Sequence, residues 1–328
     1  MNISWWLIFS ASMAIYLTIA VGAATRVAGW LTEEADHSLL RLVIRVLYPC
    51  LIFSVVSHNE ALRRPSNLLL PPLVGFGTVA LGLAAALLVA QLGRRLTGLR
   101  RGKETRTFAT CVAIYNYGFL PIPLVQALFP DSPATLGVLF VQNVGAELAV
   151  WTLCVMTLGG GLDRDWWRRI FNAPSMAIVA AIAVNSLDAW HYLPEMAVTA
   201  LDRLGQASIP MSMILIGAVI ADEIQPGTSR GRRGDGLKTI GWSVLLRLGL
   251  LPAAFLLIAS LVPASDELKR VLVILAAMPS GTFPIVMARH YGGQPRVGVQ
   301  VVLGSSLVSL LTIPLWIQFG LKFLGLSG

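Results

Sequence analysis

Ten apolar runs, each about as long as a bilayer is thick, constrain the fold of this chain more than any other feature. They lie near residues 4–25, 38–57, 67–93, 106–129, 133–158, 172–189, 197–220, 238–262, 269–289 and 297–321. A transmembrane α-helix needs about 20 mostly apolar residues. Charged residues are only 13% of the chain, against roughly 25% in a soluble domain. The sequence therefore predicts an all-α polytopic membrane protein with ten transmembrane helices, embedded in a lipid bilayer.

The Lys and Arg residues between the runs indicate which side each loop faces. Sixteen lie in the odd-numbered loops, and five lie in the even-numbered loops and the two tails. Because cytoplasmic loops carry the excess of Lys and Arg, we expect the odd loops in the cytoplasm and both termini outside. The net charge of +8 follows this sidedness, so nucleic acid is not an expected partner.

Two of the runs contain the same interruption. Residues 116–122 read Asn-Tyr-Gly-Phe-Leu-Pro-Ile and residues 279–285 read Pro-Ser-Gly-Thr-Phe-Pro-Ile, so both hold a Gly-x-x-Pro-Ile core. Proline removes a backbone donor and clashes with the preceding turn, so each helix should break there, near the middle of the membrane. A pair of Gly/Pro-interrupted apolar segments, one in each half of a chain, is the best pointer in a sequence to a transporter's binding site.

The two halves of the chain match at nearly constant spacing. Gly118 and Gly281 are 163 residues apart, and so are Pro121 and Pro284; two further proline pairs repeat at 161 and 162 residues. With five runs in each half, the second half enters the membrane from the opposite side. The spacing predicts two inverted five-helix repeats, residues 1–158 and 172–328, joined by a cytoplasmic linker at 159–171, with the broken fourth and ninth helices crossing at mid-membrane.

These segments resemble the auxin efflux carrier family. Residues 115–123, with Asn-x-Gly-Phe-Leu-Pro-x-Pro, are similar to the broken fourth helix of that family, and the stretches 142–153, 278–293 and 305–316 are similar to its fifth helix and its last two. The resemblance implies the bile acid/sodium symporter fold, with helices 1, 2, 6 and 7 as a scaffold and helices 3–5 and 8–10 as a moving core. It also implies a homodimer in the bacterial inner membrane that carries a small organic anion such as malate or malonate. The long central loop of the plant carriers is replaced by about a dozen residues.

The interrupted runs supply most of the candidate substrate-binding residues. Asn116 lies beside a break, where half-helix N-termini offer donors to an anion; alternatively, its amide satisfies backbone freed by Pro121. The hydroxyls of Ser280 and Thr282 serve the second break, or hydrogen-bond their own helix instead. Glycines at the breaks would allow close backbone approach. The full candidate set is Asn116, Gly118, Pro121, Ser280, Gly281, Thr282, Pro284 and Asn143.

Two ionisable residues inside the runs are further candidates. Glu147 lies one helical turn after Asn143, and a carboxylate within a membrane should face the protein interior and either pair or take up a proton. It is therefore a candidate proton-coupling group, or else a structural partner for a basic residue such as Arg247. Arg247 is a candidate partner for the charge of the substrate.

No cofactor, metal site or catalytic residue is expected. Cys50, Cys111 and Cys154 lie singly in separate runs, and the histidines show no ligand spacing. No nucleophile pattern is present, so we expect no enzyme. The sequence favours a secondary active transporter for a small organic anion, working by alternating access and coupled to protons. Two alternatives are a sodium-coupled symporter on the same fold and a membrane protein that senses a ligand or lipid without moving it.

Overall fold

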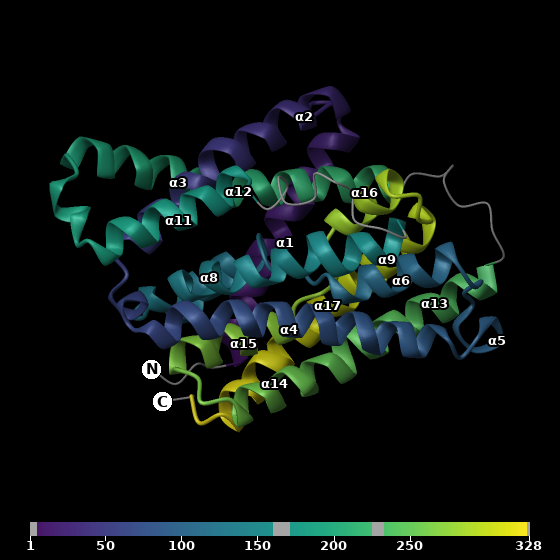
Figure 1. Cartoon of the computed structure of the whole chain (residues 1–328). Helices are drawn as coiled ribbons and strands as arrows, with labels where there is room; N and C mark the ends of the chain where they lie inside the picture. Colours follow the sequence, from purple (N-terminus) through teal and green to yellow (C-terminus); the bar gives the residue numbers. More distant parts are fainter. Residues whose placement is uncertain (1–4, 160–170, 225–232, 327–328) are drawn as a thin grey trace.

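The computed structural model describes residues 5–159, 171–224 and 233–326, and these ranges are built mainly of α-helices (Figure 1). The first half contains α1 (Trp5–Val27), α2 (Glu33–Leu42), α3 (Tyr48–Ser57), α4 (Pro65–Ala90), α5 (Arg94–Thr97), α6 (Lys103–Ala113), α7 (Pro121–Leu128), α8 (Pro133–Ala149) and α9 (Val155–Gly159). The second half contains α11 (Ala173–Ser186), α12 (Glu195–Ile224), α13 (Arg233–Leu245), α14 (Leu251–Leu261), α15 (Asp266–Ala277), α16 (Phe283–His290) and α17 (Pro295–Phe323). Short 3₁₀ turns lie at Glu60–Arg63 and Ala189–Tyr192.

Helices occupy all ten apolar runs, and within the described ranges seven helical segments are long and apolar enough to cross a membrane. Those seven are Trp5–Val27, Glu33–Ser57, Pro65–Ala90, Pro133–Gly159, Glu195–Asp222, Asp235–Leu261 and Pro295–Phe323. The other three runs differ because α11 is short and because the fourth and ninth runs are each split into two helices, α6 with α7 and α15 with α16. The linker expected at 159–171 lies almost entirely outside the described residues.

The helices pack in two groups. One group consists of α1, α3, α11 and α12, and in the other α4 packs on α6 and α8 while α15 packs on α14 and α17. In Figure 1, α3, α11 and α12 lie along the upper edge and α4 and α14 along the lower edge. Polar contacts hold the first group together: Asp202 of α12 accepts a hydrogen bond from Ser54, and Asn185 of α11 donates to the carbonyls of Val56 and Ser57 at 3.2 Å each. These groups consist of the helices expected for a scaffold and a core.

Glycine allows unusually close helix packing in the first group. A Cβ added at Gly22 of α1 would lie 2.1 Å from the carbonyl oxygen of Ile214 in α12. A Cβ added at Gly217 of α12 would lie 1.9 Å from the carbonyl oxygen of Ile19 in α1. Membrane helices lack a hydrophobic force between them, so small residues that bring two backbones together stabilise their contact by dispersion. This reciprocal glycine pair fixes α1 against α12.

The same device joins α4 to α8 in the second group. A Cβ at Gly145 would lie 1.7 Å from the carbonyl oxygen of Pro72, and one at Gly75 would lie 2.2 Å from that of Gln142. Gly75 belongs to a Gly-x-Gly sequence that superficially matches a nucleotide-binding loop. Its position inside α4 shows that it serves helix packing, and this contact holds α8 beside the break that follows α6.

Three of the long segments contain five residues of π-helix: η1 (Val43–Leu47), η3 (Val150–Cys154) and η5 (Leu246–Leu250). Proline follows η5 at Pro252 and has no N–H to donate to the carbonyl of Leu248, four residues earlier. The indole Nε1 of Trp316 donates to that carbonyl oxygen instead, at 2.6 Å. The freed backbone group is therefore satisfied by a neighbouring helix, as a membrane environment requires.

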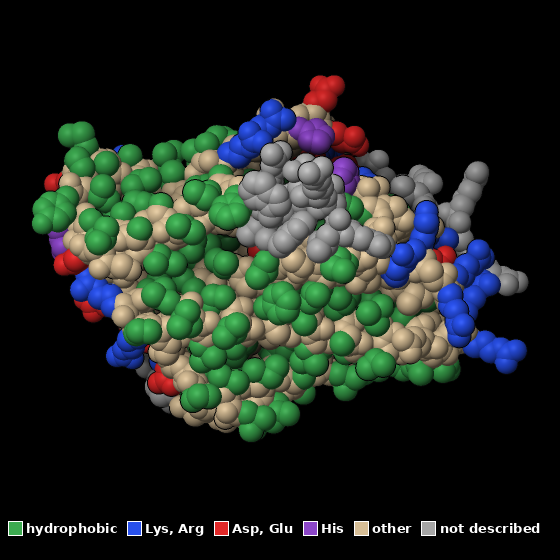
Figure 2. Space-filling view, in the orientation of Figure 1, with side chains coloured by type: hydrophobic (Ala, Val, Ile, Leu, Met, Phe, Trp, Pro, Cys, Tyr) green, Lys and Arg blue, Asp and Glu red, His purple; other side chains and the backbone are tan. Residues whose placement is uncertain are grey.

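The two ends of the helix bundle differ in charge. Lys and Arg side chains gather at the end that holds α5 and the start of α13, whereas apolar side chains cover much of the visible surface between the ends (Figure 2). The two chain termini lie near one another at the opposite end (Figure 1). Which side of a membrane each end faces stays a prediction.

Candidate functional site at the paired helix breaks

The first break separates α6 from α7. Helix α6 ends at Ala113, Ile114 takes an extended conformation with φ −84° and ψ 90°, and α7 begins at Pro121. A proline in the first turn of a helix suits that position because its missing N–H would have no partner there. The sequence prediction of a break at this motif is confirmed.

The second break separates α15 from α16 in the same way. Helix α15 ends at Ala277, Met278 is extended with φ −72° and ψ 138°, and α16 begins at Phe283 with Pro284 in its first turn. Pro279 follows Met278 directly and accounts for its extended backbone. Both Gly-x-x-Pro-Ile cores therefore place their proline in the first turn of the second half-helix.

The two breaks are hydrogen-bonded to each other. Tyr115 and Ser280 form an isolated antiparallel β-bridge. The backbone N–H of Asn116 donates to the carbonyl of Pro279 at 2.8 Å, and that of Gly281 donates to the carbonyl of Ile114 at 2.9 Å. Unwound backbone is tolerated at membrane depth only where it finds partners within the protein. The breaks meet as the sequence predicted, although the depth of this meeting point in a bilayer stays a prediction.

Asn116 satisfies backbone groups beside the break, which is the structural alternative to substrate contact. Its side-chain oxygen accepts hydrogen bonds from the backbone N–H groups of Phe119 and Leu120, at 3.2 Å each, just before α7 begins. Its side-chain nitrogen donates to no other described residue, and the residue is only half-buried. The amide is thus held in place by its oxygen, which leaves two N–H donors for a ligand.

Asn143 of α8 lies beside the first break. Its side-chain nitrogen donates to the carbonyl of Tyr117 at 2.9 Å, while its side-chain oxygen is buried with no partner among the described residues. A buried polar atom without a partner costs about 1–3 kcal/mol. Such atoms are therefore good candidates for contact with a ligand.

The second break carries a similar unsatisfied group. The hydroxyl of Ser280 is buried and has no hydrogen-bond partner in the described chain, and the backbone N–H of the same residue donates to the hydroxyl of Ser305 at 3.2 Å. Thr282 directly precedes α16 and is half-buried, but its side chain makes no capping hydrogen bond. The crossing therefore brings Asn116, Asn143, Ser280 and Thr282 to one region from opposite halves of the chain.

The glycines at the breaks are not required by contacts with the protein. A Cβ at Gly118 would meet nothing nearer than the hydroxyl of Tyr48, at 3.8 Å, and one at Gly281 would lie 3.5 Å from the carbonyl of Tyr115. Both are ordinary contact distances, and neither glycine has a positive φ. The close approach expected of these glycines is therefore absent within the protein. Pro121 and Pro284 are buried and shape the backbone without offering a donor.

Arg247 donates hydrogen bonds to the backbone at the end of α15, where the second break begins. Its fully buried guanidinium donates from Nε to the carbonyl of Met278 at 2.9 Å, and from Nη2 to those of Leu275 and Ala276 at 3.1 and 3.2 Å. It lies 4.9 Å from the ring centre of Tyr115. The C-terminus of α15 carries unsatisfied carbonyls and a partial negative charge, so a cation is favourable there. Arg247 therefore stabilises the break itself, and contact with the charge of a substrate stays a prediction.

Glu147 pairs with α11 rather than with a basic residue. Asn172, at the start of α11, donates to its Oε1 at 2.9 Å, and the Ser175 hydroxyl donates to its Oε2 at 3.2 Å. The suggested structural partner, Arg247, is bonded to carbonyls instead, so that pairing is wrong. The positive end of a helix favours a carboxylate. Because α8 and α11 belong to different packing groups, this contact links them.

Three aromatic residues of the site were missed by the sequence analysis. The hydroxyl of Tyr115 accepts a hydrogen bond from Gln142 and pairs with the hydroxyl of Thr78, both at 2.9 Å. The hydroxyl of Tyr48 lies beside Gly118, and the rings of Tyr115 and Tyr117 meet edge to face with their centres 5.9 Å apart. Tyr115 and Tyr117 flank Asn116 in the sequence, so an aromatic pair around the break asparagine was the available signal. Tyr48 lies on α3, far from the break in the sequence, so no sequence signal pointed to it.

The described residues contain no group of three or more His, Cys, Asp or Glu side chains that could hold a metal ion. The three cysteines are unpaired thiols. The oxygen and nitrogen atoms that meet at the breaks can bind a small polar ligand, but the described side chains there include no activated nucleophile with an adjacent base.

The chain is similar in sequence to several transporters. A family model described as a membrane transport protein matches residues 7–165 and 161–317. An uncharacterized transporter of Methanothermobacter thermautotrophicus is 26% identical over 307 residues, which cover 93% of this chain and 95% of the relative. An uncharacterized transporter of Methanocaldococcus jannaschii is 22% identical, with 93% and 96% covered. Auxin efflux carrier component 8 of Arabidopsis thaliana is 21% identical, with 94% and 97% covered.

Proposed function

The chain belongs to the membrane transport protein family, to which the auxin efflux carriers belong, and we propose that it is a secondary carrier of a small organic anion. Membership of this family, together with the long apolar helices, makes it an integral membrane transporter. Its relatives are transporters rather than enzymes.

The paired breaks carry the proposal. They bring two half-helix N-termini, the free donors of Asn116 and the buried hydroxyl of Ser280 to one place. Positive helix ends and hydrogen-bond donors favour a negatively charged group. The carboxylate nearest to these residues, that of Glu147, accepts hydrogen bonds from Asn172 and Ser175, and the donors at the breaks support a mono- or dicarboxylate as substrate.

We further propose that the carrier has ten spans in two inverted repeats, residues 1–158 and 172–328. It would lie in the bacterial inner membrane with both termini on the external side. The seven long helical segments would supply seven of these spans, and α6 with α7, α15 with α16, and α11 would supply the other three. Alternating access would then follow from movement of the group containing α4, α8, α15 and α17 against the group containing α1, α3, α11 and α12. Most of the helix contacts lie within one group or the other, which supports such a movement, and the groups meet mainly where α1 packs on α7 and α17.

Glu147 is the proposed site of proton coupling. Glu147 belongs to α8, in the group proposed to move, and its carboxylate accepts hydrogen bonds from Asn172 and Ser175 in the other group. Any sliding of α8 past α11 must break these two hydrogen bonds. A proton that neutralises the carboxylate would weaken the contact, so protonation and movement would be linked.

Sodium coupling is the second candidate, and the buried oxygens of Asn143 and Gln142 favour it. Neither oxygen has a partner among the described residues, and neutral carbonyl oxygens are ligands that a hard cation prefers. The two coupling modes predict opposite responses: a proton gradient alone, or a sodium gradient alone, would drive accumulation in liposomes.

A binding experiment tests the proposed site. Asn116→Ala in purified protein should weaken binding of the transported anion by about tenfold, since it removes a donor to a charged group. Gln126→Ala is the matched control because Gln126 is an exposed amide on α7, the helix that follows the break. Equal affinity in both variants, with folded and monodisperse samples, would show that Asn116 only supports the start of α7.

A further inference from the structure

A polar cavity of about 300 Å³ lies at the basic end of the molecule, away from the paired breaks. It is enclosed by the segment that follows α5 and by the first turns of three helices, α6, α13 and α17. Its lining contains none of the candidate substrate-binding residues. The charged residues that line it are Arg94, Arg100, Glu104, Asp235 and Arg296.

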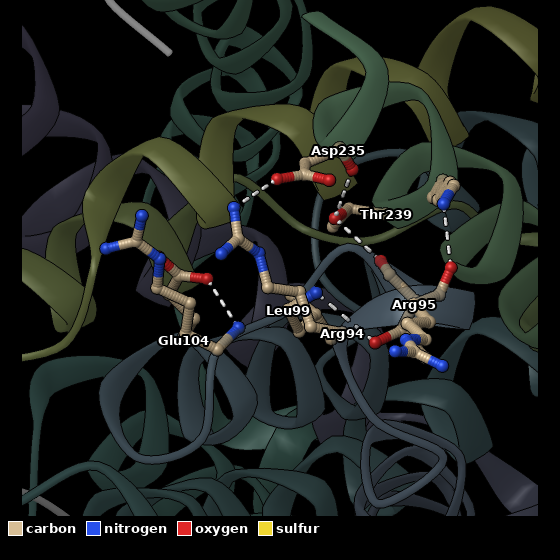
Figure 3. Close-up of polar contacts among 9 residues, drawn as sticks. Arg94, Arg95, Leu99, Glu104, Asp235 and Thr239 are labelled. Carbon is tan, nitrogen blue, oxygen red and sulfur yellow. Dashed lines mark hydrogen bonds and ion pairs between the residues drawn. The ribbon is translucent and has the colours of Figure 1, made fainter. Parts of the chain in front are cut away.

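The two carboxylates in this cavity are already engaged. Arg94 donates to Oδ2 of Asp235 at 2.7 Å, and the backbone N–H of Arg100 donates to Oε2 of Glu104 at 2.7 Å (Figure 3). The guanidinium of Arg100, by contrast, makes no hydrogen bond or ion pair with any described residue. Among the described residues that line the cavity, three arginines and two carboxylates carry a net charge of +1.

The backbone around the cavity is held in a fixed shape. Gly98 has a φ of +75°, and a Cβ there would lie 2.2 Å from the carbonyl oxygen of Asp235, so the segment after α5 is seated directly on α13. Thr239 of α13 donates to the carbonyl of Thr97 at 3.0 Å, and Lys238 donates to that of Arg95 at 2.7 Å (Figure 3). Arg94 and Arg100 therefore project from a segment that is fixed against α13, which lowers the entropic cost of ordering them around a ligand.

The positive N-terminal ends of α6 and α17 add to this charge. Helix α6 follows Gly102 and helix α17 follows Gln294, and neither has a side-chain capping hydrogen bond at its start. By comparison, α2, α11 and α15 are capped by Thr32, Asn172 and Ser265. The first N–H groups of a helix carry a partial positive charge that favours an anion.

We propose that this cavity binds a phosphate group, carried either by the headgroup of an anionic lipid or by a soluble phosphate. Arginine is suited to this ligand because its planar fork matches phosphate oxygens and stays charged. The arginines come from three different elements and can approach different oxygens of a tetrahedral anion, whereas a carboxylate offers only two. Basic pockets between membrane helices on the cytoplasmic side commonly hold lipid headgroups.

The test uses full-length protein, freed of lipid and purified in detergent. One arm titrates inorganic phosphate by calorimetry against chloride at the same ionic strength. The second arm reconstitutes the protein in an equal mixture of phosphatidylglycerol and phosphatidylcholine and counts retained lipid by native mass spectrometry. Each arm compares wild type with Arg100→Gln, Arg296→Gln and the control Arg101→Gln, which removes a neighbouring exposed arginine that does not line the cavity.

Arg100→Gln and Arg296→Gln should each weaken binding by about tenfold, because each removes charged hydrogen bonds to the phosphate, whereas Arg101→Gln should match wild type. Saturable binding of inorganic phosphate identifies a soluble ligand, and selective retention of phosphatidylglycerol alone identifies a lipid headgroup. If Arg296→Gln fails to stay monodisperse, Arg100→Gln carries the test, since its exposed side chain holds no described partner. Absence of binding in both arms, or equal binding by all three variants, would overturn the proposal.

Discussion

Replacing Arg247 with methionine should destabilise the protein by removing the support behind the second break. The side chain is fully buried, and its guanidinium donates to three carbonyl oxygens, those of Leu275, Ala276 and Met278. Each carbonyl would lose a donor at a net cost of about 1 kcal/mol, which gives about 3 kcal/mol in all. A shift of roughly 2 °C for each kcal/mol in a chain of this size gives a midpoint about 6 °C lower.

Thermal unfolding in detergent, at one fixed scan rate, measures this change. Arg247→Lys should fall between wild type and Arg247→Met, because a single ammonium cannot reach all three carbonyls in the planar geometry of a guanidinium. Arg203→Met is the matched control, since Arg203 is exposed on α12, and exposed substitutions usually change stability by less than about 0.5 kcal/mol. If Arg247→Met melts at the wild-type temperature, Arg247 does not stabilise the break, and its role as a partner for substrate charge becomes the stronger interpretation.

Three further predictions follow from the packing and the charges. Gly145→Val should destabilise the protein by about 1–3 kcal/mol, because a Cβ would lie 1.7 Å from the Pro72 carbonyl oxygen. The control Gly77→Val, at a site with nothing within 4 Å, should be tolerated, and equal melting temperatures of the two variants would contradict the close packing of α4 and α8. Glu147→Gln should exchange substrate across liposomes yet fail to accumulate it under a proton gradient, while exposed Glu60→Gln behaves as wild type; a variant that still responds to the proton gradient places coupling elsewhere. Reporter fusions after Gly328 and near Arg232 should give external and cytoplasmic signals respectively, and a cytoplasmic signal at Gly328 would refute the orientation.

The helical framework was readable from the sequence because its causes are local. Apolar runs of spanning length placed all ten helical regions, and proline at residues 121 and 284 placed both breaks. The pairing of the breaks was also accessible, since freed backbone groups in a membrane must find partners. Helix α5 and the first turn of α6, by contrast, lie between the third and fourth apolar runs, and no sequence signal marked them because their residues are mostly charged or polar.

The partners of the buried polar residues were not readable, because they depend on how distant helices pack. Glu147 and Arg247 form a plausible pair by charge, yet Glu147 meets the start of α11 and Arg247 meets the end of α15. Helix ends carry partial charges that a residue-by-residue comparison overlooks. For Asn116 the sequence offered two roles, contact with the substrate and support of the backbone, and could not decide between them. In the structure the two roles fall to different atoms of the amide: its oxygen accepts hydrogen bonds at the start of α7, and its nitrogen is left for a ligand.

Counterflow in liposomes tests the central proposal most directly. Vesicles loaded with an unlabelled mono- or dicarboxylate should take up the same labelled anion through the wild-type protein, because a carrier that alternates between two faces exchanges substrate without net driving force. The double variant Asn116→Ala with Ser280→Ala, which removes one polar group from each break, should lose this uptake, and Gln126→Ala should retain it. Undiminished uptake by the folded double variant, or no uptake of any such anion by the wild type, would contradict the account.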